Sequence, residues 1–147
     1  MYGDSLALFW IIVGFEFPPL MDEPHKSRSV RDFWKRWDTV IQKLLFKFVY
    51  KPSRQIGLPS IVAVALTFIA SGLVHVLPII VSLGKNWRAA NMMMGYFIVQ
   101  LSIMLLEKPL KVETWSSQAQ VIWTAVNIFA PSYLLVAPCL ELTGIKF

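Results

Sequence analysis

The chain has 147 residues and a formal net charge of +5, and 56% of its residues are hydrophobic while only 16% are charged. Soluble domains contain about 45–50% apolar residues, so this excess, gathered in long uncharged runs, predicts an integral membrane protein. The single cysteine, Cys139, excludes an internal disulfide and a cysteine-based zinc site, and we expect no bound metal.

The first apolar run covers residues 5–20, and it is shorter than the roughly twenty residues that normally cross the hydrocarbon core of a bilayer. Glu16 lies inside this run, and Pro18 and Pro19 end it. We expect a short or partial span. The glutamate either reaches the membrane interface or serves as an intramembrane functional carboxylate. A polar connector, residues 21–28, follows.

Residues 29–50 carry an amphipathic helical pattern. Its apolar residues recur at steps of three and four: Val30, Phe33, Trp34, Trp37, Ile41, Leu44, Leu45 and Phe48. Ser29 is expected to cap the helix, Asp32 to complete a capping-box-like start and to pair with Arg36, and Pro52 to help end it. A basic, aromatic helix of this type lies in a membrane interface, although it also occurs as a solvated helix on a soluble core.

Three longer apolar segments follow, at residues 61–83, 89–106 and 121–140, and Pro131 is expected to bend the last one. The predicted fold is therefore an all-α integral membrane helical bundle with three to four transmembrane helices and an interfacial amphipathic helix, forming a single membrane domain over residues 1–147. Basic residues gather between Lys26 and Arg54 and recur after residue 106, so both loops are predicted on the cytosolic side.

The basic segment also bears on the binding partners. Cations beside bilayer-length apolar segments favour anionic lipid headgroups or an anionic substrate, and they argue against nucleic acid.

The segment 61–83 contains the residues best suited to chemistry. Thr67, Ser71 and His75 are spaced by four and form one polar stripe, while Gly72 permits close approach of another helix or of a substrate. Two interpretations of His75 remain open. It is either a packing histidine, held by Ser71 or by a group from another helix, or a general base that removes a proton from an alcohol.

Two motifs in this order resemble the membrane-bound O-acyltransferase superfamily, and within it the wax-synthase-like branch. They are SVRDFWKRWD, continued by an aromatic and basic stretch into VYKP, and ASGLVH. The resemblance implies acyl transfer from acyl-CoA to a lipid or other hydroxyl acceptor, with acyl-CoA as a possible substrate, no cofactor, and an endoplasmic reticulum location.

The resemblance also implies roles for individual residues. His75 corresponds to the catalytic histidine and Ser71 belongs to the same motif, while Phe33, Trp34, Arg36 and Trp37 are placed at the acyl-CoA or catalytic chamber. Asp38 occupies a second catalytic position where the family usually has Asn or His, and its charge would repel an anionic donor.

The number of spans leaves two hypotheses for the protein as a whole. Enzymes of this superfamily generally have eight or more membrane helices, so this chain is expected to resemble part of such an enzyme, completed by other membrane subunits or by self-association. The alternative is a non-catalytic structural subunit of a membrane complex, for instance in an organellar energy-converting membrane. Catalysis predicts that His75 lines an accessible cavity, whereas a scaffold predicts that it is packed shut. A transporter is less well supported, because the spans define no charged pathway.

Overall fold

A computed structural model describes residues 21–83 and 86–143, and these residues form helices with no β-strand among them. The predicted first span, residues 5–20 with Glu16, lies outside the described residues. The order of the main helices is α2 (Val30–Trp37), α3 (Thr39–Leu45), α4 (Lys51–Gln55), α5 (Ser60–Leu83), α6 (Trp87–Glu107), α7 (Ser117–Phe129) and α8 (Tyr133–Leu142). The prediction of an all-α membrane bundle is confirmed.

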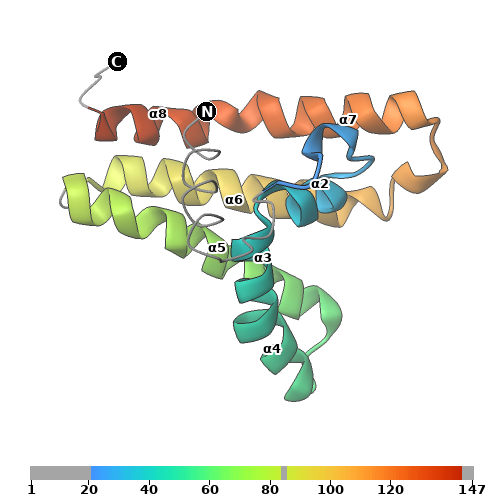
Figure 1. Ribbon diagram of the computed structural model, residues 1–147, viewed down its shortest axis with the longest axis horizontal. Coiled ribbons are helices and arrows are strands. Elements are labelled where there is room, and N and C mark those ends of the chain that lie inside the picture. Colours follow the sequence, from blue (N-terminus) through green and yellow to red (C-terminus); the bar gives the residue numbers. More distant parts are fainter. Residues whose placement is uncertain (1–20, 84–85, 144–147) are drawn as a thin grey trace, which may run out of the picture.

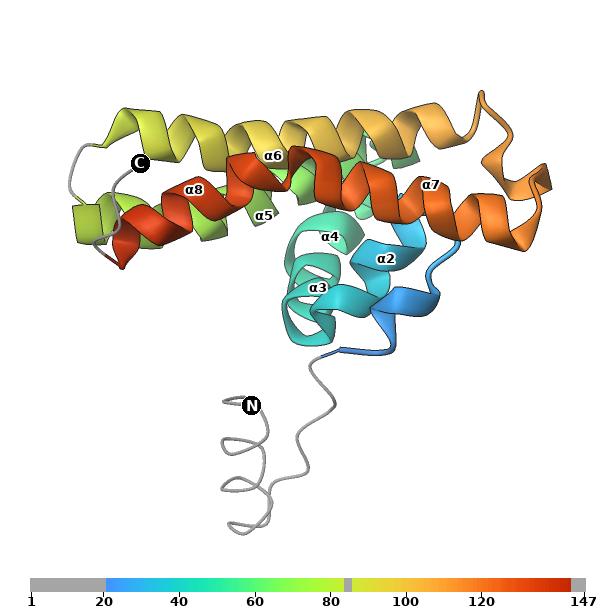
Figure 2. The same ribbon diagram turned by 90° about the horizontal axis from the view of Figure 1, so that it is seen from above.

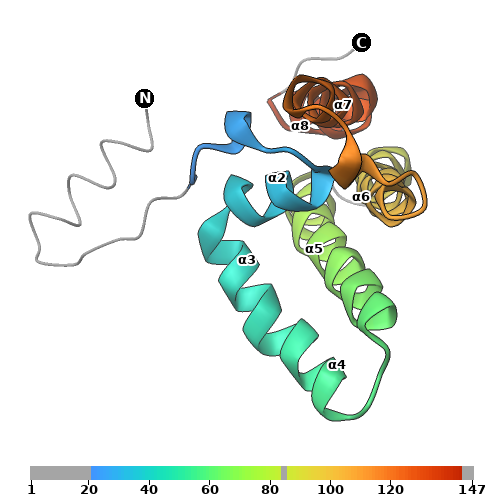
Figure 3. The same ribbon diagram turned by 90° about the vertical axis from the view of Figure 1, so that its right-hand side faces the viewer.

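Three segments of this part of the chain are long and apolar enough to cross a membrane: Ser60–Leu83, Trp87–Glu107 and Ser117–Glu141. They pack side by side as the bundle in Figure 1, and Figure 3 shows α6, α7 and α8 nearly end on and α5 obliquely. The third begins four residues before the predicted start at Val121, because Ser116 caps it through an Oγ that accepts the Ala119 N–H at 3.3 Å. At Pro131 a 3₁₀ turn separates α7 from α8, where the sequence predicted a bend.

The core of the bundle lies between α5 and α6. Its buried residues are Val76, Ile79, Ala89, Ala90, Met93, Tyr96 and Phe97. Gly72 is buried in the same contact, and a Cβ at this position would lie 2.8 Å from the Met94 sulfur and 3.4 Å from Phe97 Cβ. The expected role of Gly72 in close helix packing is therefore confirmed.

Gly72 and Gly95, both helical within the described bundle, should respond differently to alanine. Gly95→Ala should raise the free energy of unfolding by about 0.5–1 kcal/mol, because alanine favours the helix and the nearest side-chain atom, Leu134 Cδ1, is 4.0 Å away. Gly72→Ala should give no such gain, because Met94 must move. Thermal unfolding of the two variants in one detergent checks this, and equal stabilisation would contradict the close α5–α6 contact.

The amphipathic segment is not one helix over residues 29–50, and that prediction is wrong in two respects. The helix is interrupted at Asp38. The Oδ1 of Asp38 accepts the Ile41 N–H at 3.0 Å and caps the next helix, α3. A π-helical turn, Phe46–Tyr50, then leads into α4, so the helix continues past Pro52 to Gln55. This wide turn ends two residues before Pro52, whose nitrogen has no hydrogen to donate.

Helices α3 and α4 run beside α5 and away from the rest of the bundle (Figures 2 and 3). Between Leu44 and Ile56 this part of the chain exposes four large apolar side chains: Leu44, Phe46, Phe48 and Ile56. In contrast, α2 packs on the bundle through Val30, Phe33 and Trp34. The exposed side chains suit a membrane interface, and the interfacial position of this segment stays a prediction.

A buried carboxylate at the end of α6 fixes α2 in place. Glu107 is 7% exposed, and its Oε1 accepts the Val30 N–H at 2.6 Å and the Trp123 indole N–H at 3.3 Å, while Oε2 accepts the Arg31 N–H at 3.4 Å. Negative charge is favourable at a helix N-terminus, where the first N–H groups have no partner within the helix. Ser29 also caps α2 as predicted, with its Oγ 2.9 Å from the Asp32 nitrogen.

Candidate active site

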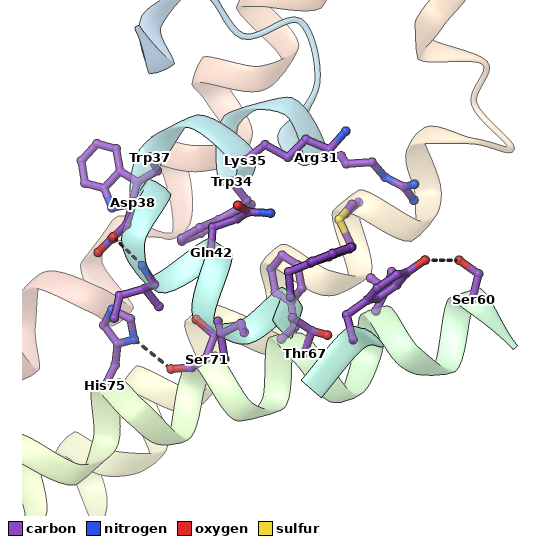
Figure 4. Close-up of a pocket in the computed structure, with 17 residues that line it drawn as sticks. Arg31, Trp34, Lys35, Trp37, Asp38, Gln42, Ser60, Thr67, Ser71 and His75 are labelled. Carbon is purple, nitrogen blue, oxygen red and sulfur yellow. Dashed lines mark hydrogen bonds between the residues drawn. The ribbon is translucent and has the colours of Figure 1, made fainter. Parts of the chain in front are cut away.

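A cavity of about 370 Å³ lies between the α2–α4 segment and α5. Figure 4 shows its lining, with side chains from both walls directed toward the same space. The lining residues are Arg31, Trp34, Lys35, Trp37, Asp38, Ile41, Gln42, Leu45, Phe46, Tyr50, Ser60, Val64, Thr67, Phe68, Ser71, His75 and Met104. The amphipathic segment and the intramembrane histidine therefore share one cavity, and His75 is not packed shut.

The hydrogen bond of His75 fixes the form of its neutral ring. Nδ1 lies 2.8 Å from the backbone oxygen of Ser71, one turn earlier in α5. A carbonyl oxygen can only accept, so Nδ1 carries the hydrogen and Nε2 keeps the lone pair. The ring also lies against Phe97 of α6, with centroids 4.8 Å apart. The sequence left two hydrogen-bond partners open for His75, Ser71 or a group from another helix, and the structure supplies Ser71 through its backbone oxygen.

The polar stripe of α5 faces the cavity along its length. Ser60, Thr67, Ser71 and His75 all line it, and Thr67 Oγ1 donates to the Ala63 carbonyl oxygen at 2.7 Å. At one end of the cavity, the Ser60 hydroxyl and the Tyr50 hydroxyl form a hydrogen bond of 3.2 Å that links the two walls. The cavity thus runs along a hydroxyl-bearing helix face to the histidine (Figure 4).

The opposite wall of the cavity is formed by the α2–α4 segment, and its lining residues keep one helical spacing across the interruption at Asp38. Arg31, Lys35, Asp38, Gln42 and Leu45 follow one another at steps of four and three, and all of them line the cavity. Arg31 and Lys35 were not among the residues predicted for the site. Their spacing relative to Asp38 was the signal that could have found them.

Trp34 is positioned by a buried amide. Its indole nitrogen lies 3.4 Å from Oε1 of Gln100, which is fully buried, and Gln100 Nε2 donates to the Asn127 carbonyl oxygen at 2.9 Å. Gln100 therefore connects α2, α6 and α7 behind the cavity wall. In the sequence it appears only as a polar residue within an apolar span, and no local pattern relates it to Trp34.

Two of the residues expected at the chamber lie outside its lining. Phe33 stacks on Trp37 with centroids 5.2 Å apart and so supports the wall from behind. Arg36 Nε donates to Asp32 at 3.0 Å, which confirms the predicted pair, and its guanidinium also reaches the Asp22 carbonyl oxygen at 3.3 Å. The hydrogen bond to Asp32 raises the pKa of Arg36 above its usual value. The arginine therefore tethers the connector to α2.

Asp38 lines the cavity and caps α3, and two substitutions separate these roles. Asp38→Asn keeps a good capping side chain and removes the negative charge, so we expect unchanged stability and tighter binding of the anionic acyl donor that the resemblance implies. Asp38→Ala should lower the free energy of unfolding by about 0.5–2 kcal/mol, because the cap is lost. Thermal unfolding measures the stability of both variants, and titration with acyl-CoA measures donor binding by Asp38→Asn. Weaker binding by Asp38→Asn would show that the negative charge of Asp38 does not oppose the donor.

Comparison with known proteins agrees with the two motifs. The sequence model of the "Membrane bound O-acyl transferase family" matches residues 17–100, which include both walls of the cavity. The chain is 30% identical over 121 residues to "Probable long-chain-alcohol O-fatty-acyltransferase 8" of Arabidopsis thaliana, covering 75% of this chain and 35% of the relative.

The names of two further relatives give different acceptor molecules. "Acyl-CoA–sterol O-acyltransferase 1" of Arabidopsis thaliana is 31% identical over 94 residues, which are 57% of this chain and 26% of the relative. "Diacylglycerol O-acyltransferase 1A" of Glycine max is 29% identical over 84 residues, which are 56% of this chain and 17% of the relative. The chain thus spans about a third or less of the length of these curated relatives.

No solved structure matches the chain. The family model, however, covers more than half of it, from the connector through most of α6, and includes every residue that the motifs singled out. The chain therefore belongs to the membrane-bound O-acyltransferase family.

Proposed function

We propose that this chain carries the histidine-bearing part of a membrane O-acyl transfer site, which moves an acyl group from acyl-CoA to the hydroxyl of a lipid. The observation that carries the proposal is the placement of His75. It lines a cavity shared with the aromatic wall of α2, and its hydrogen bond to Ser71 leaves Nε2 able to accept a proton.

The reaction needs one group that first accepts and then returns a proton. In the proposed step, Nε2 of His75 takes the hydrogen of the acceptor hydroxyl while the oxygen attacks the thioester carbonyl carbon. The carbon–sulfur bond then breaks, and the departing sulfur takes the proton from the imidazolium to give free CoA and an ester. The Ser71 carbonyl holds Nδ1–H throughout and keeps the ring oriented.

The walls of the cavity suit such a pair of substrates. Apolar side chains such as Leu45, Val64 and Phe68 favour an acyl chain, and the hydroxyls of α5 offer hydrogen bonds. Arg31 and Lys35, both exposed, supply positive charge for the phosphates of the donor. A hydroxyl-bearing lipid is the proposed acceptor, since long-chain alcohols, a sterol and diacylglycerol appear in the relatives' names.

A non-catalytic subunit is the second candidate, and the exposed apolar faces of the spans favour it. On α5 alone, Leu73, Leu77 and Val81 are exposed, as expected for a helix that contacts lipid or other membrane subunits. In that role His75 would retain its hydrogen bond to Ser71 without a substrate beside it. Ester formation separates the two candidates.

The test is an acyl-transfer assay of the full chain in lipid nanodiscs. Radiolabelled long-chain acyl-CoA is supplied with a fatty alcohol, a sterol or diacylglycerol, and the labelled ester is measured. The proposal expects ester formation with at least one acceptor. If neither the isolated chain nor the chain purified with its native partners forms any ester, the enzyme hypothesis fails and the structural subunit remains.

A further inference from the structure

One aromatic side chain that does not line the cavity lies directly against its histidine. The ring of Phe97 on α6 and the ring of His75 on α5 have centroids 4.8 Å apart, and their planes are inclined at 43°. Phe97 is 2% exposed and is absent from the cavity lining. The imidazole therefore contacts a buried aromatic ring as well as the cavity.

The hydrogen bond of His75 alone does not fix the direction of its free nitrogen. Nδ1 is held 2.8 Å from the Ser71 backbone oxygen at the edge of the cavity (Figure 4). The last torsion angle of a histidine side chain has broad energy wells, so a ring with one hydrogen bond can still turn. Within residues 21–83 and 86–143, Phe97 is the one aromatic ring that His75 contacts. A flat contact of this kind restricts the turn, and with it the direction of Nε2.

Phe97 is itself held by neighbours on three helices. Its ring centroid lies 5.7 Å from that of Trp34 on α2 and 5.8 Å from that of Tyr96 on α6. On α5, Gly72 allows the close approach, because a Cβ there would be 3.4 Å from Phe97 Cβ. Gly72 lies on the turn before His75, so the same approach brings Phe97 to the imidazole. The ring behind the histidine is therefore a rigid support.

This support extends to the buried amide behind the cavity wall. Gln100 is fully buried, and its Oε1 lies 3.4 Å from the indole nitrogen of Trp34. Trp34 lines the cavity and also contacts Phe97. Helix α2 therefore contributes to the site twice, as a wall of the cavity and as a support for the ring that contacts His75.

We propose that Phe97 is a positioning residue for His75, and that its ring keeps Nε2 directed into the cavity. Phe97 touches no substrate and exchanges no proton in the transfer step. It reduces the number of ring orientations in which Nε2 misses the acceptor hydroxyl, and a misplacement of about 1 Å can cost roughly 10²-fold in rate. The catalytic effect rests on the proposed function, whereas the orientation of the ring does not.

The test compares two adjacent aromatic residues of α6. Phe97→Leu removes the ring that contacts His75. Tyr96→Leu removes a ring that is also 2% exposed, and its ring contacts in the described part of the chain are with Trp34 and Phe97. Because Tyr96→Leu also loses a hydrogen bond to the Ile128 carbonyl oxygen, it should destabilise the bundle at least as much. If Phe97→Leu does not fold, Phe97→Met replaces it, since methionine fills irregular core space without a flat face.

The first measurement is the position of the ring hydrogen of His75, and it needs no activity. Solid-state NMR of the full chain in lipid bilayers, with isotope-labelled histidine, reports it at a pH where imidazole is neutral. The chain has two histidines, so the exposed His25 serves as the internal reference. The unmodified chain should carry the hydrogen on Nδ1 of His75. We expect Phe97→Leu to raise the share on Nε2 by about twofold or more, and Tyr96→Leu to leave it unchanged.

The second measurement is the kinetics of ester formation by the same variants. We expect Phe97→Leu to lower kcat by roughly tenfold to a hundredfold while KM for acyl-CoA stays within about twofold, and Tyr96→Leu to keep kcat within about threefold. A role in orientation alone predicts this split, because substrate binding is untouched.

Equal effects of the two leucine variants would overturn the positioning role, since they would reflect a general loosening of the core. So would an unchanged ring hydrogen in Phe97→Leu, or an unchanged kcat of that variant in a chain that makes ester. If the unmodified chain makes no ester, the proposed function fails, and the NMR measurement still decides whether Phe97 orients His75.

Discussion

Replacement of His75 by alanine should abolish most of the proposed acyl-transfer activity while leaving the fold intact. General-base catalysis contributes about 10²–10⁴-fold to a reaction rate, so we expect kcat to fall by roughly that factor. The side chain is partly exposed toward the cavity, and its hydrogen bond is to the backbone of its own helix, so its removal breaks no hydrogen bond between helices and loses only the ring contact with Phe97. The measurement is initial ester formation at saturating acyl-CoA.

The other histidine of the chain provides a matched control. His25 is exposed in the connector and does not line the cavity. His25→Ala should therefore retain the activity of the unmodified chain, and the two alanine variants should unfold within a few degrees of each other. If His75→Ala keeps more than about a tenth of the activity, the general-base role is incorrect.

The second large effect is expected at Glu107, and it concerns stability. Glu107→Ala leaves the N–H groups of Val30 and Arg31 and the indole N–H of Trp123 without their acceptor at a buried position. Lost hydrogen bonds to a charged group cost about 1.5–3 kcal/mol each, but they are not additive here, so we expect roughly 2–5 kcal/mol in total. Thermal or denaturant unfolding in detergent measures it.

Glu113→Ala is the control for that prediction, because Glu113 is an exposed glutamate of the following loop. It should change stability by less than about 0.5 kcal/mol. Glu107→Gln should fall between the two, since its amide oxygen can still accept from Val30 while its NH₂ group faces the Arg31 N–H. Equal stability of all three variants would show that the carboxylate does not hold α2 against α6.

Hydropathy and periodicity predicted the parts of the fold that depend on local sequence. The spans at 61–83 and 89–106 agree with α5 and α6 to within one or two residues, because an uncharged run of that length has few alternatives. The break at Asp38 was missed. A helical pattern continues through that residue, and only the hydrogen bond from Ile41 N–H reveals that it caps a new helix.

The candidate site could be predicted where a residue and its contact partner lie on the same helix. His75 and Ser71 lie one turn apart on α5. Trp34, Trp37 and Asp38 lie on the facing segment. All five residues line the cavity. The supporting contacts of Gln100 and Glu107 join residues far apart in the chain, at 66 and 77 positions from their partners. Sequence spacing carries no signal for such contacts.

The central claim is that His75 presents a reactive nitrogen to a ligand cavity shared with α2 and α3. Modification by diethyl pyrocarbonate, read for each histidine by mass spectrometry, tests it directly, because the reagent attacks an unprotonated ring nitrogen. With His25 as the internal reference, we predict that His75 reacts in the free chain and is protected by long-chain acyl-CoA. A His75 that does not react, or that reacts equally with and without acyl-CoA, would contradict the account.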